Sequence, residues 1–255
     1  MQHVSYGCCT LSHIPLRASG SHRSEMVSQL LFGETYRVLQ SEGDWLSVES
    51  DTDTYRGYIA ANQHYGLSEA EYLLLRQTPA ECALEPLVLR CDNNGQRLTA
   101  PTAATLPLDP QNHIRIGKLQ FTLESERRAL TLPDILAGYT NAPYLWGGRT
   151  PWGLDCSGFT QAVCRTQGIA LPRDASMQAQ LGQEVPLAQA GFGDLAFFHN
   201  AEGRIVHTGW VLSPERILHC SGCVREDRLD EKGILRISDL TYTHALHCIK
   251  HIAHF

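Results

Sequence analysis

The most informative stretch of this 255-residue chain reads Pro143-Tyr144-Leu145-Trp146-Gly147-Gly148 and then Gly153-Leu154-Asp155-Cys156-Ser157-Gly158-Phe159. Apolar residues follow Cys156 at helical spacing, and Gly168 with Pro172 ends the segment. This pattern predicts a buried helix of about 12 residues, within the usual range for globular proteins, with Cys156 in its first turn.

A thiol in the first turn of a helix meets unpaired backbone N–H groups and the positive end of the helix dipole. Both favour the thiolate, so we expect the pKa of Cys156 to be lowered, as in a nucleophilic cysteine. A packed core cysteine fits the same position, and position alone does not separate the two interpretations.

Two histidines downstream are candidates for a base and its orienting partner. Arg204–Leu212 is predicted to form a strand, Ser213-Pro214-Glu215 a turn, and Arg216–His219 the returning strand. A hairpin centred near Pro214 places His219 opposite Gly209, so His207 and His219 share one face as diagonal neighbours. A slip of one residue would separate them onto opposite faces.

Six motifs in this order resemble the NlpC/P60 cysteine peptidases and together span roughly residues 133–251. They are Tyr144–Gly148, Asp155–Phe159, Leu171-Pro172-Arg173-Asp174, Gly193-Asp194-Leu195, His207-Thr208-Gly209 and Ile217-Leu218-His219. The resemblance implies a papain-like α+β catalytic domain with the cysteine on a helix and the histidines on an antiparallel sheet. It assigns the nucleophile to Cys156, the base to His207 and the third polar residue to His219.

The region ahead of this segment has the character of small β modules. Short predicted strands with turn punctuation indicate a small barrel, and a capped helix follows it. A second β stretch then runs to the point near 128–133 where helices and reactive side chains begin. The predicted elements are strands Thr35–Gln40, Trp45–Glu49 and Gly57-Tyr58-Ile59, a helix over Ser68–Gln77 and the β stretch Leu84–Leu123.

We therefore expect one or two small all-β SH3-like barrels ahead of the catalytic domain. The predicted division is residues 1–66 for the first SH3-like domain, 67–130 for a second with its linker, and 131–255 for the catalytic domain.

The first module resembles the bacterial SH3-like domains of γ-D-glutamyl-L-diamino acid endopeptidases in its segments at 22–29, 43–45 and 55–58. In such enzymes this module restricts the active site to peptides with a free N-terminal L-Ala. The resemblance assigns the amine of that residue to Glu25, Tyr55 and Asp174. Asp174 also has a competing structural role, because Arg173-Asp174-Ala175-Ser176 reads as a helix start with an N-cap.

Further substrate contacts are expected from side chains near the nucleophile. Tyr144 and Trp146 are predicted to line the site, with a packed aromatic pair as the alternative. The remaining candidates are Asp155, Ser157 and Ser176.

Composition excludes several other classes of protein. Twenty-one Lys and Arg against 27 Asp and Glu leave a net charge of −6, which argues against a nucleic-acid partner. There is no run of about 18 apolar residues and no signal-peptide pattern, so we expect a cytoplasmic protein without a membrane partner, or a periplasmic one if a leader has been removed. Nine cysteines, an odd number, fit a reducing compartment.

No cofactor or metal is expected, and we expect a monomer. Cys220-Ser221-Gly222-Cys223 has the spacing of a redox or zinc motif but lacks the surrounding pattern of either. His244, His247, His251 and His254 would form a metal-binding face only if their segment were helical, and Ala245–Ile252 fits a final strand equally well.

The predicted function is hydrolysis of the γ-D-glutamyl–diamino acid bond of cell-wall peptides with a free N-terminal L-Ala, in cell-wall turnover or recycling. The alternatives are a non-catalytic cell-wall peptide binding protein and a papain-like amidase or acyltransferase. An intact Cys156, His207 and His219 argues against the first. An ammonium pocket, which an acyltransferase does not need, argues against the second.

Overall fold

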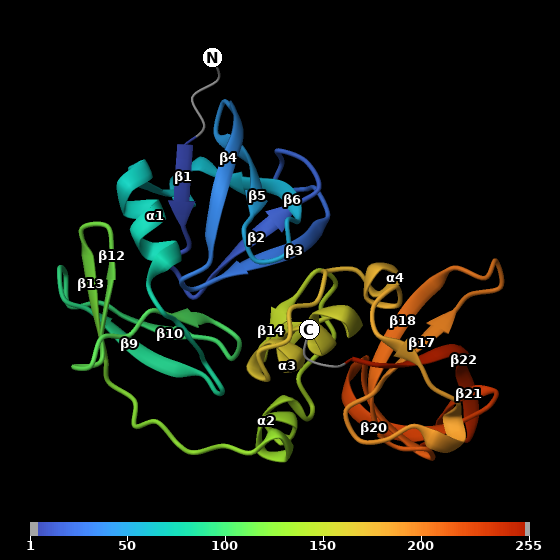
Figure 1. The fold of residues 1–255 in the computed structure, drawn as a ribbon. Helices are drawn as coiled ribbons and strands as arrows, with labels where there is room; N and C mark the ends of the chain where they lie inside the picture. The colour runs from blue at the N-terminus through green and yellow to red at the C-terminus, as the bar shows by residue number, and fades with distance from the viewer. Residues whose placement is uncertain (1–4, 253–255) are drawn as a thin grey trace. The chain divides into compact units, whose positions relative to one another are not determined.

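The computed structural model describes residues 5–252, and the chain divides into two compact units, Met1–Ile135 and Leu136–Phe255 (Figure 1). The division falls within helix α2 (Leu132–Tyr139), just beyond the composition change near 128–133. Among the described helices, none has the length and apolar character needed to span a membrane.

The first unit begins with an antiparallel seven-stranded sheet in the order β3-β2-β6-β5-β4-β1-β7. Its core contains Ile14, Leu30, Tyr36, Val48 and Ile59, all fully buried. The small all-β module predicted here is confirmed. Its strands are β1 (Ser5–Cys8), β2 (His13–Arg17), β3 (Met26–Leu31), β4 (Thr35–Glu42), β5 (Trp45–Ser50), β6 (Arg56–Ala60) and β7 (Tyr65–Leu67), with a 3-10 turn η1 (Ala61–Gln63).

The β4–β5 hairpin is tighter than the sequence pattern indicates. Glu42 pairs with Trp45, so only Gly43 and Asp44 form the turn, whereas the predicted strands Thr35–Gln40 and Trp45–Glu49 leave four residues between them. Gly43 has φ +59°, a conformation that glycine adopts without a steric penalty and that short hairpin turns require.

Helix α1 (Glu69–Gln77) begins where its capping signal predicts. Ser68 Oγ accepts a hydrogen bond from the Glu71 N–H, and the Glu71 side chain accepts one from the Ser68 N–H at 2.8 Å. This reciprocal capping box satisfies two backbone donors that the helix itself cannot pair.

The second β stretch forms a separate four-stranded sheet, in the order β10-β9-β13-β12, but not a separate core. Phe32 and Tyr72 of the first part pack in one cluster with Leu89, Ile114 and Phe121 of the second. The two parts therefore bury their apolar faces against each other. The strands are β8 (Glu81–Cys82), β9 (Leu87–Cys91), β10 (Arg97–Ala100), β11 (Thr105–Leu106), β12 (His113–Ile116) and β13 (Leu119–Leu123).

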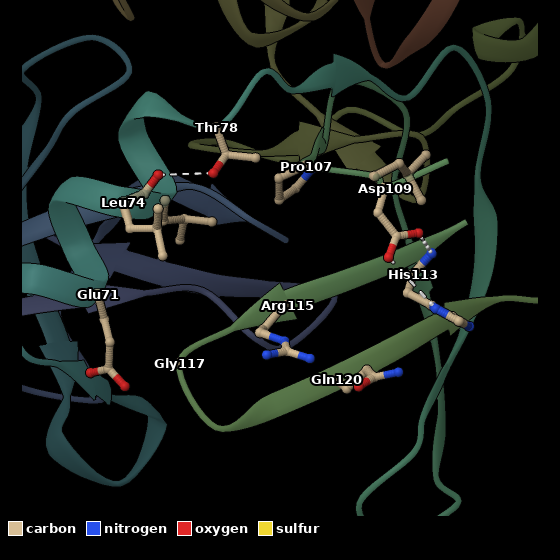
Figure 2. A pocket seen from close by; sticks show the side chains of 11 residues that line it. Glu71, Leu74, Thr78, Pro107, Asp109, His113, Arg115, Gly117 and Gln120 are labelled. Atoms are coloured by element: carbon tan, nitrogen blue, oxygen red, sulfur yellow. Dashed lines mark hydrogen bonds and ion pairs between the residues drawn. The ribbon is translucent and has the colours of Figure 1, made fainter. Parts of the chain in front are cut away.

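A cavity of about 290 Å³ lies between α1 and the β12–β13 hairpin in this unit (Figure 2). Leu74 and Pro107 give it an apolar side, and Glu71, His113 and Arg115 give it polar groups. Its described lining residues include no cysteine, so this cavity is not the site of Cys156 chemistry.

The second unit combines α3 (Cys156–Thr166) with a six-stranded closed sheet. The order β22-β17-β18-β19-β20-β21 is completed by pairing of β21 with β22 (Figure 1), and β16 pairs with Lys250 and His251 at the end of β22. The elements are β14 (Arg149–Thr150), β15 (Gly153–Leu154), α4 (Ala175–Gln178), β16 (Gln183–Glu184), η2 (Leu187–Gln189), β17 (Leu195–His199), β18 (Ile205–Ser213), β19 (Arg216–Ser221), β20 (Cys223–Asp230), β21 (Gly233–Arg236) and β22 (Thr241–His251).

The interior of this closed sheet is apolar at its centre. All six strands contribute to its cluster of buried residues, which includes Phe198, Val211, Ile217, Leu229 and Ile234. Because side chains alternate along a strand, the residues two positions away on the same strands also face the interior. The α+β class predicted for the catalytic part is confirmed.

Candidate active site

Cys156 is the first residue of helix α3, and Asp155 is its N-cap. The Asp155 carboxylate accepts hydrogen bonds from Gly158 N–H at 2.7 Å and from Gly147 N–H at 2.9 Å. A Cβ on Gly158 would lie 2.2 Å from the carbonyl oxygen of Gly148, so only glycine fits there. The glycines of the motif therefore let the preceding loop approach the helix start and fix Cys156 in place. The predicted helix position is confirmed.

The same carboxylate forms a buried ion pair with Arg173. The guanidinium donates to both Asp155 oxygens, at 3.0 and 2.6 Å, and to Ser157 Oγ at 2.9 Å. Arg173 is only 1% exposed. Asp155 and Ser157, both predicted to contact substrate, thus have structural partners around the helix start, and a substrate contact from either stays a prediction.

The pKa of Cys156 differs from the expectation drawn from its helix position. Burial, followed by the Asp155 charge, raises the pKa of the thiol to about 12. Hydrogen bonds from the backbone of Thr208 and Ser157 and the charge of Arg173 lower it, but they do not compensate. The expectation of a lowered pKa was wrong, because burial outweighs the helix start.

His207 and His219 lie as the hairpin register predicts. Gly209 pairs with His219, which puts both histidines on the inner face of the closed sheet. His207 Nε2 and His219 Nδ1 are 2.8 Å apart and hydrogen-bonded. Both side chains are buried, at 4% and 0% exposed. The predicted pairing of these two histidines is confirmed.

The link between Cys156 and His207 runs through the neighbouring backbone. The backbone of Thr208, which follows His207 on β18, acts on the thiol of Cys156 and lowers its pKa, although burial outweighs this effect. Within residues 5–252, no hydrogen bond joins the Cys156 thiol directly to the His207 ring. Burial, followed by His244 and His219, lowers the pKa of His207 well below its ordinary value. Near pH 7 both the thiol and the imidazole are therefore uncharged in this structure.

Asp227, on β20, is a functional candidate that sequence reasoning missed. Its Oδ2 lies 3.0 Å from His219 Nε2 and also accepts from Arg225 Nε and Nη2, at 2.8 and 2.6 Å. Burial raises the pKa of Asp227, but these hydrogen bonds and one from Ile237 N–H outweigh it and hold the pKa at about 2. The carboxylate is therefore ionised behind the histidine pair.

His244, on β22, is the second residue that sequence reasoning did not place here. Its ring stacks on that of His207, with centroids 4.0 Å apart and planes 21° apart. Ring nitrogens of His207, His219 and His244 lie within 4.8 Å of one another, a spacing that a metal site requires. An imidazole binds a metal in its ring plane, however, and two stacked, nearly parallel rings do not direct their nitrogens at one ion.

Several predicted substrate contacts lie near the start of α3. Tyr144 is 36% exposed and Trp146 59% exposed. Burial, then the charges of Cys156 and Asp155, raises the pKa of Tyr144. Ser176 is exposed on α4. Asp174 is the N-cap residue of that helix, as the sequence predicts, although its side chain makes no capping hydrogen bond.

Glu25 and Tyr55 belong to the first unit and flank the same strand of its sheet. Glu25 precedes β3 and its backbone carbonyl accepts from Ala18 N–H, while Tyr55 precedes β6 and packs on the core. Strand β2 lies between β3 and β6, since Arg17 pairs with both Met26 and Tyr58. The structure thus places the two residues at neighbouring strand ends.

The Cys220–Cys223 segment and the described C-terminal histidines, both considered as metal or redox sites, lie in a hairpin turn and a strand. Cys220 and Cys223 stand on either side of a tight turn, and Cys220 Sγ donates to the carbonyl of Leu154. Every one of the nine cysteines is a free thiol. The segment with the C-terminal histidines is strand β22, not a helix, and His254 lies outside the described residues.

Comparison with protein families and known proteins agrees with this site. Residues 141–238 match the NlpC/P60 family, and residues 16–63 match the bacterial dipeptidyl-peptidase Sh3 domain. A crystal structure of an NlpC/P60 family protein from Bacillus cereus ATCC 10987 aligns with a TM-score of 0.80 over 97% of this chain and 99% of that one. Its 18% identity supports the fold.

Curated relatives extend over most of the chain. The gamma-D-glutamyl-L-lysine dipeptidyl-peptidase of Bacillus subtilis is 30% identical over 213 residues, 75% of this chain and 71% of the relative. The protein of the same name from Bacillus cereus is 32% identical, covering 78% and 68%. Dipeptidyl-peptidase 6 of Lysinibacillus sphaericus is 24% identical, covering 89% and 93%. With the cysteine, the paired histidines and these alignments together, the chain belongs to the NlpC/P60 family of cysteine peptidases.

Proposed function

We propose that this protein is a cysteine peptidase that hydrolyses the γ-D-glutamyl–diamino acid bond of peptidoglycan peptides carrying a free N-terminal L-Ala. One observation carries the chemistry: a buried chain of hydrogen bonds runs from Asp227 through His219 to His207, and the backbone of Thr208, the next residue, acts on the thiol of Cys156 at the first turn of α3. The names of the B. subtilis and B. cereus relatives supply the class of bond.

In the first step, Cys156 gives its proton to Nδ1 of His207 and its sulfur attacks the carbonyl carbon of the γ-D-glutamyl bond. Catalytic hydrogen bonds commonly tighten only in the substrate complex, which suits a thiol and an imidazole that are both neutral beforehand. The resulting imidazolium is held by His219, through the hydrogen bond that already joins the two rings.

The oxyanion that forms needs hydrogen-bond donors at the start of α3. The Gly158 N–H is occupied by Asp155, whereas the Cys156 N–H, two residues earlier, has no acceptor within the helix. We assign the oxyanion to the Cys156 N–H, a kind of donor whose removal in other enzymes costs roughly 3–4 kcal/mol.

The C–N bond then breaks as His207 donates its proton to the leaving amine, and a thioester remains on Cys156. Water, deprotonated by His207, hydrolyses the thioester and releases the L-Ala-γ-D-Glu carboxylate. His207 thus ends the cycle neutral and Cys156 regains its proton.

Recognition of the free amine is assigned to the carboxylates of Glu25 and Asp174, with Tyr55 as a hydrogen-bond acceptor. An ammonium group needs compensating negative charge when it leaves water.

The test compares L-Ala-γ-D-Glu-L-Lys with its N-acetylated form. We expect cleavage of the free peptide only, and a loss of kcat/KM in Glu25→Gln and in Asp174→Asn. Glu42→Gln, an exposed carboxylate of the same unit as Glu25, is the matched control and should cleave normally. Equal cleavage of both peptides would refute the amine requirement. Absence of cleavage of either would refute the substrate class.

A further inference from the structure

The carboxylate of Asp227 accepts hydrogen bonds from four donor atoms. Its Oδ2 is bonded to His219 Nε2 and to two nitrogens of Arg225, and its Oδ1 accepts from Ile237 N–H at 2.9 Å. The residue is 2% exposed. Because all four partners face a carboxylate that can only accept, the nitrogen of His219 toward Asp227 must carry a proton.

The proton on His219 Nε2 determines the direction of the remaining hydrogen bond, the one between His219 and His207. A neutral imidazole has one N–H and one lone pair, so protonation of His219 at Nε2 leaves a lone pair at Nδ1. That lone pair can only accept, and its partner at 2.8 Å is His207 Nε2, which must then be the donor. His207 is consequently left with its lone pair at Nδ1, the nitrogen that the peptidase reaction needs as a base.

We propose that Asp227 is a positioning residue that fixes the tautomers of His219 and His207, so that Nδ1 of His207 is the proton acceptor for Cys156. The inference rests on the proposed function and adds a fourth member to its machinery. Asp227 touches neither the nucleophile nor the other reacting atoms and acts through two histidines in series.

Arg225 has a supporting role in this arrangement. Its side chain is 28% exposed at the end of the inner face, and its two bonds to Oδ2 hold the carboxylate toward His219. On β19 the residue paired with Arg225 is His219 itself. The ion pair therefore also limits the net charge next to the histidines.

Long-range ¹⁵N–¹H correlation spectra of protein labelled with ¹⁵N at its 12 histidines report which ring nitrogens of His207 and His219 carry a proton. The signals of these two residues are assigned by their loss in His207→Gln and in His219→Gln. In the unaltered protein at neutral pH, we expect both rings to be protonated at Nε2. A His207 protonated at Nδ1 would overturn the proposal without any variant of Asp227.

The variants separate positioning from folding. Asp227→Ala should give His219 and His207 mixed tautomers and lower kcat about 10²- to 10⁴-fold, the range expected when a base is held in the wrong tautomer. KM should change little. Asp227→Asn should keep its oxygen toward Arg225 and His219, because that orientation satisfies three donors, and so should retain the Nε2 signature and more activity than Asp227→Ala.

Glu226→Gln is the matched control, since Glu226 neighbours Asp227 on β20 but forms an exposed pair with Arg216. It should leave spectra and kcat unchanged. If kcat fell in Asp227→Ala while the tautomers of His207 and His219 stayed the same, Asp227 would have only a structural role and the proposal would be overturned. Turnover by a Cys156→Ala variant would instead refute the proposed function, and the spectra would still report on the tautomers.

Discussion

Arg173 and Asp155 form a buried bidentate ion pair, with guanidinium–carboxylate distances of 3.0 and 2.6 Å, and Asp155 directly precedes the candidate nucleophile in the sequence. The same carboxylate caps helix α3. One charged pair therefore both closes the helix start and determines where Cys156 lies.

Replacing Arg173 by Met should destabilise the second unit strongly. It leaves Asp155 charged and buried without its cation, a kind of change that costs about 3–5 kcal/mol. Hydrogen exchange at the amides of α3 measures the effect within this unit. Adding Asp155→Asn should restore part of the loss, because Asn still caps the helix and carries no charge.

Arg216→Met serves as the comparison, because Arg216 forms an exposed pair with Glu226. Exposed pairs contribute little to stability, so exchange in α3 should stay as in the unaltered protein. Protection of α3 that is equal in the Arg173 and Arg216 variants would contradict the role given to the buried pair.

Alkylation of Cys156 should follow the raised pKa of its thiol. Since burial raises that pKa to about 12 and lowers that of His207, the free protein holds a thiol and a neutral imidazole. The rate of iodoacetamide labelling at Cys156 should therefore rise steadily from pH 5 to pH 9. A rate that stays flat down to acidic pH would reveal a thiolate–imidazolium pair and contradict this account.

Acid should weaken the fold through Asp227. Its pKa is about 2 in the folded protein against an ordinary 3.8, so its contribution is full above pH 4 and is lost as pH falls toward 2. The shift corresponds to about 2 kcal/mol. Unfolding experiments should show Asp227→Asn clearly less stable than the parent at pH 6, with the difference shrinking at pH 2.5. A difference that stays constant over this range would argue against ionised Asp227 in the folded state.

His244 should support His207 through its ring and not through its charge. Burial, then His219 and Arg225, lowers the pKa of His244 to about 4, so it is neutral near pH 7. His244→Phe keeps a stacked ring and should retain kcat. His244→Ala removes a contact of about 0.5–1.5 kcal/mol, which corresponds to a loss of up to about tenfold if the ring orientation limits the rate.

His247→Ala, on the same strand but exposed, is the control and should behave like the parent. Steady-state kinetics with the free tripeptide distinguishes the variants. Identical kcat values for His244→Phe and His244→Ala would show that stacking is irrelevant to the reaction.

The parts of the site that could be predicted from sequence are those fixed by local patterns. The apolar spacing after Cys156 determines its helix, and the short turn at Pro214 determines the register that pairs His219 with Gly209. Both depend on residues close together in the chain, where geometry leaves few choices.

The site residues that the sequence did not predict, Asp227 and His244, reach the site through strand pairings. Asp227 is a diagonal neighbour of His219 through the turn at Gly222, and a hairpin centred there would have placed it on the histidine face. His244 reaches His207 only because β22 pairs with β17 and β21, which no local pattern indicates. The pKa of Cys156 was missed for a different reason: burial is a property of the folded packing around the thiol.

The role of Cys156 as nucleophile is tested by measuring hydrolysis of L-Ala-γ-D-Glu-L-Lys by Cys156→Ala beside Cys220→Ala. Cys220 is a buried thiol of the same unit with no assigned chemical role. We predict that Cys220→Ala releases L-Ala-γ-D-Glu and lysine, whereas Cys156→Ala binds the peptide and releases neither. Release of both products by Cys156→Ala would contradict the central claim that Cys156 is the nucleophile.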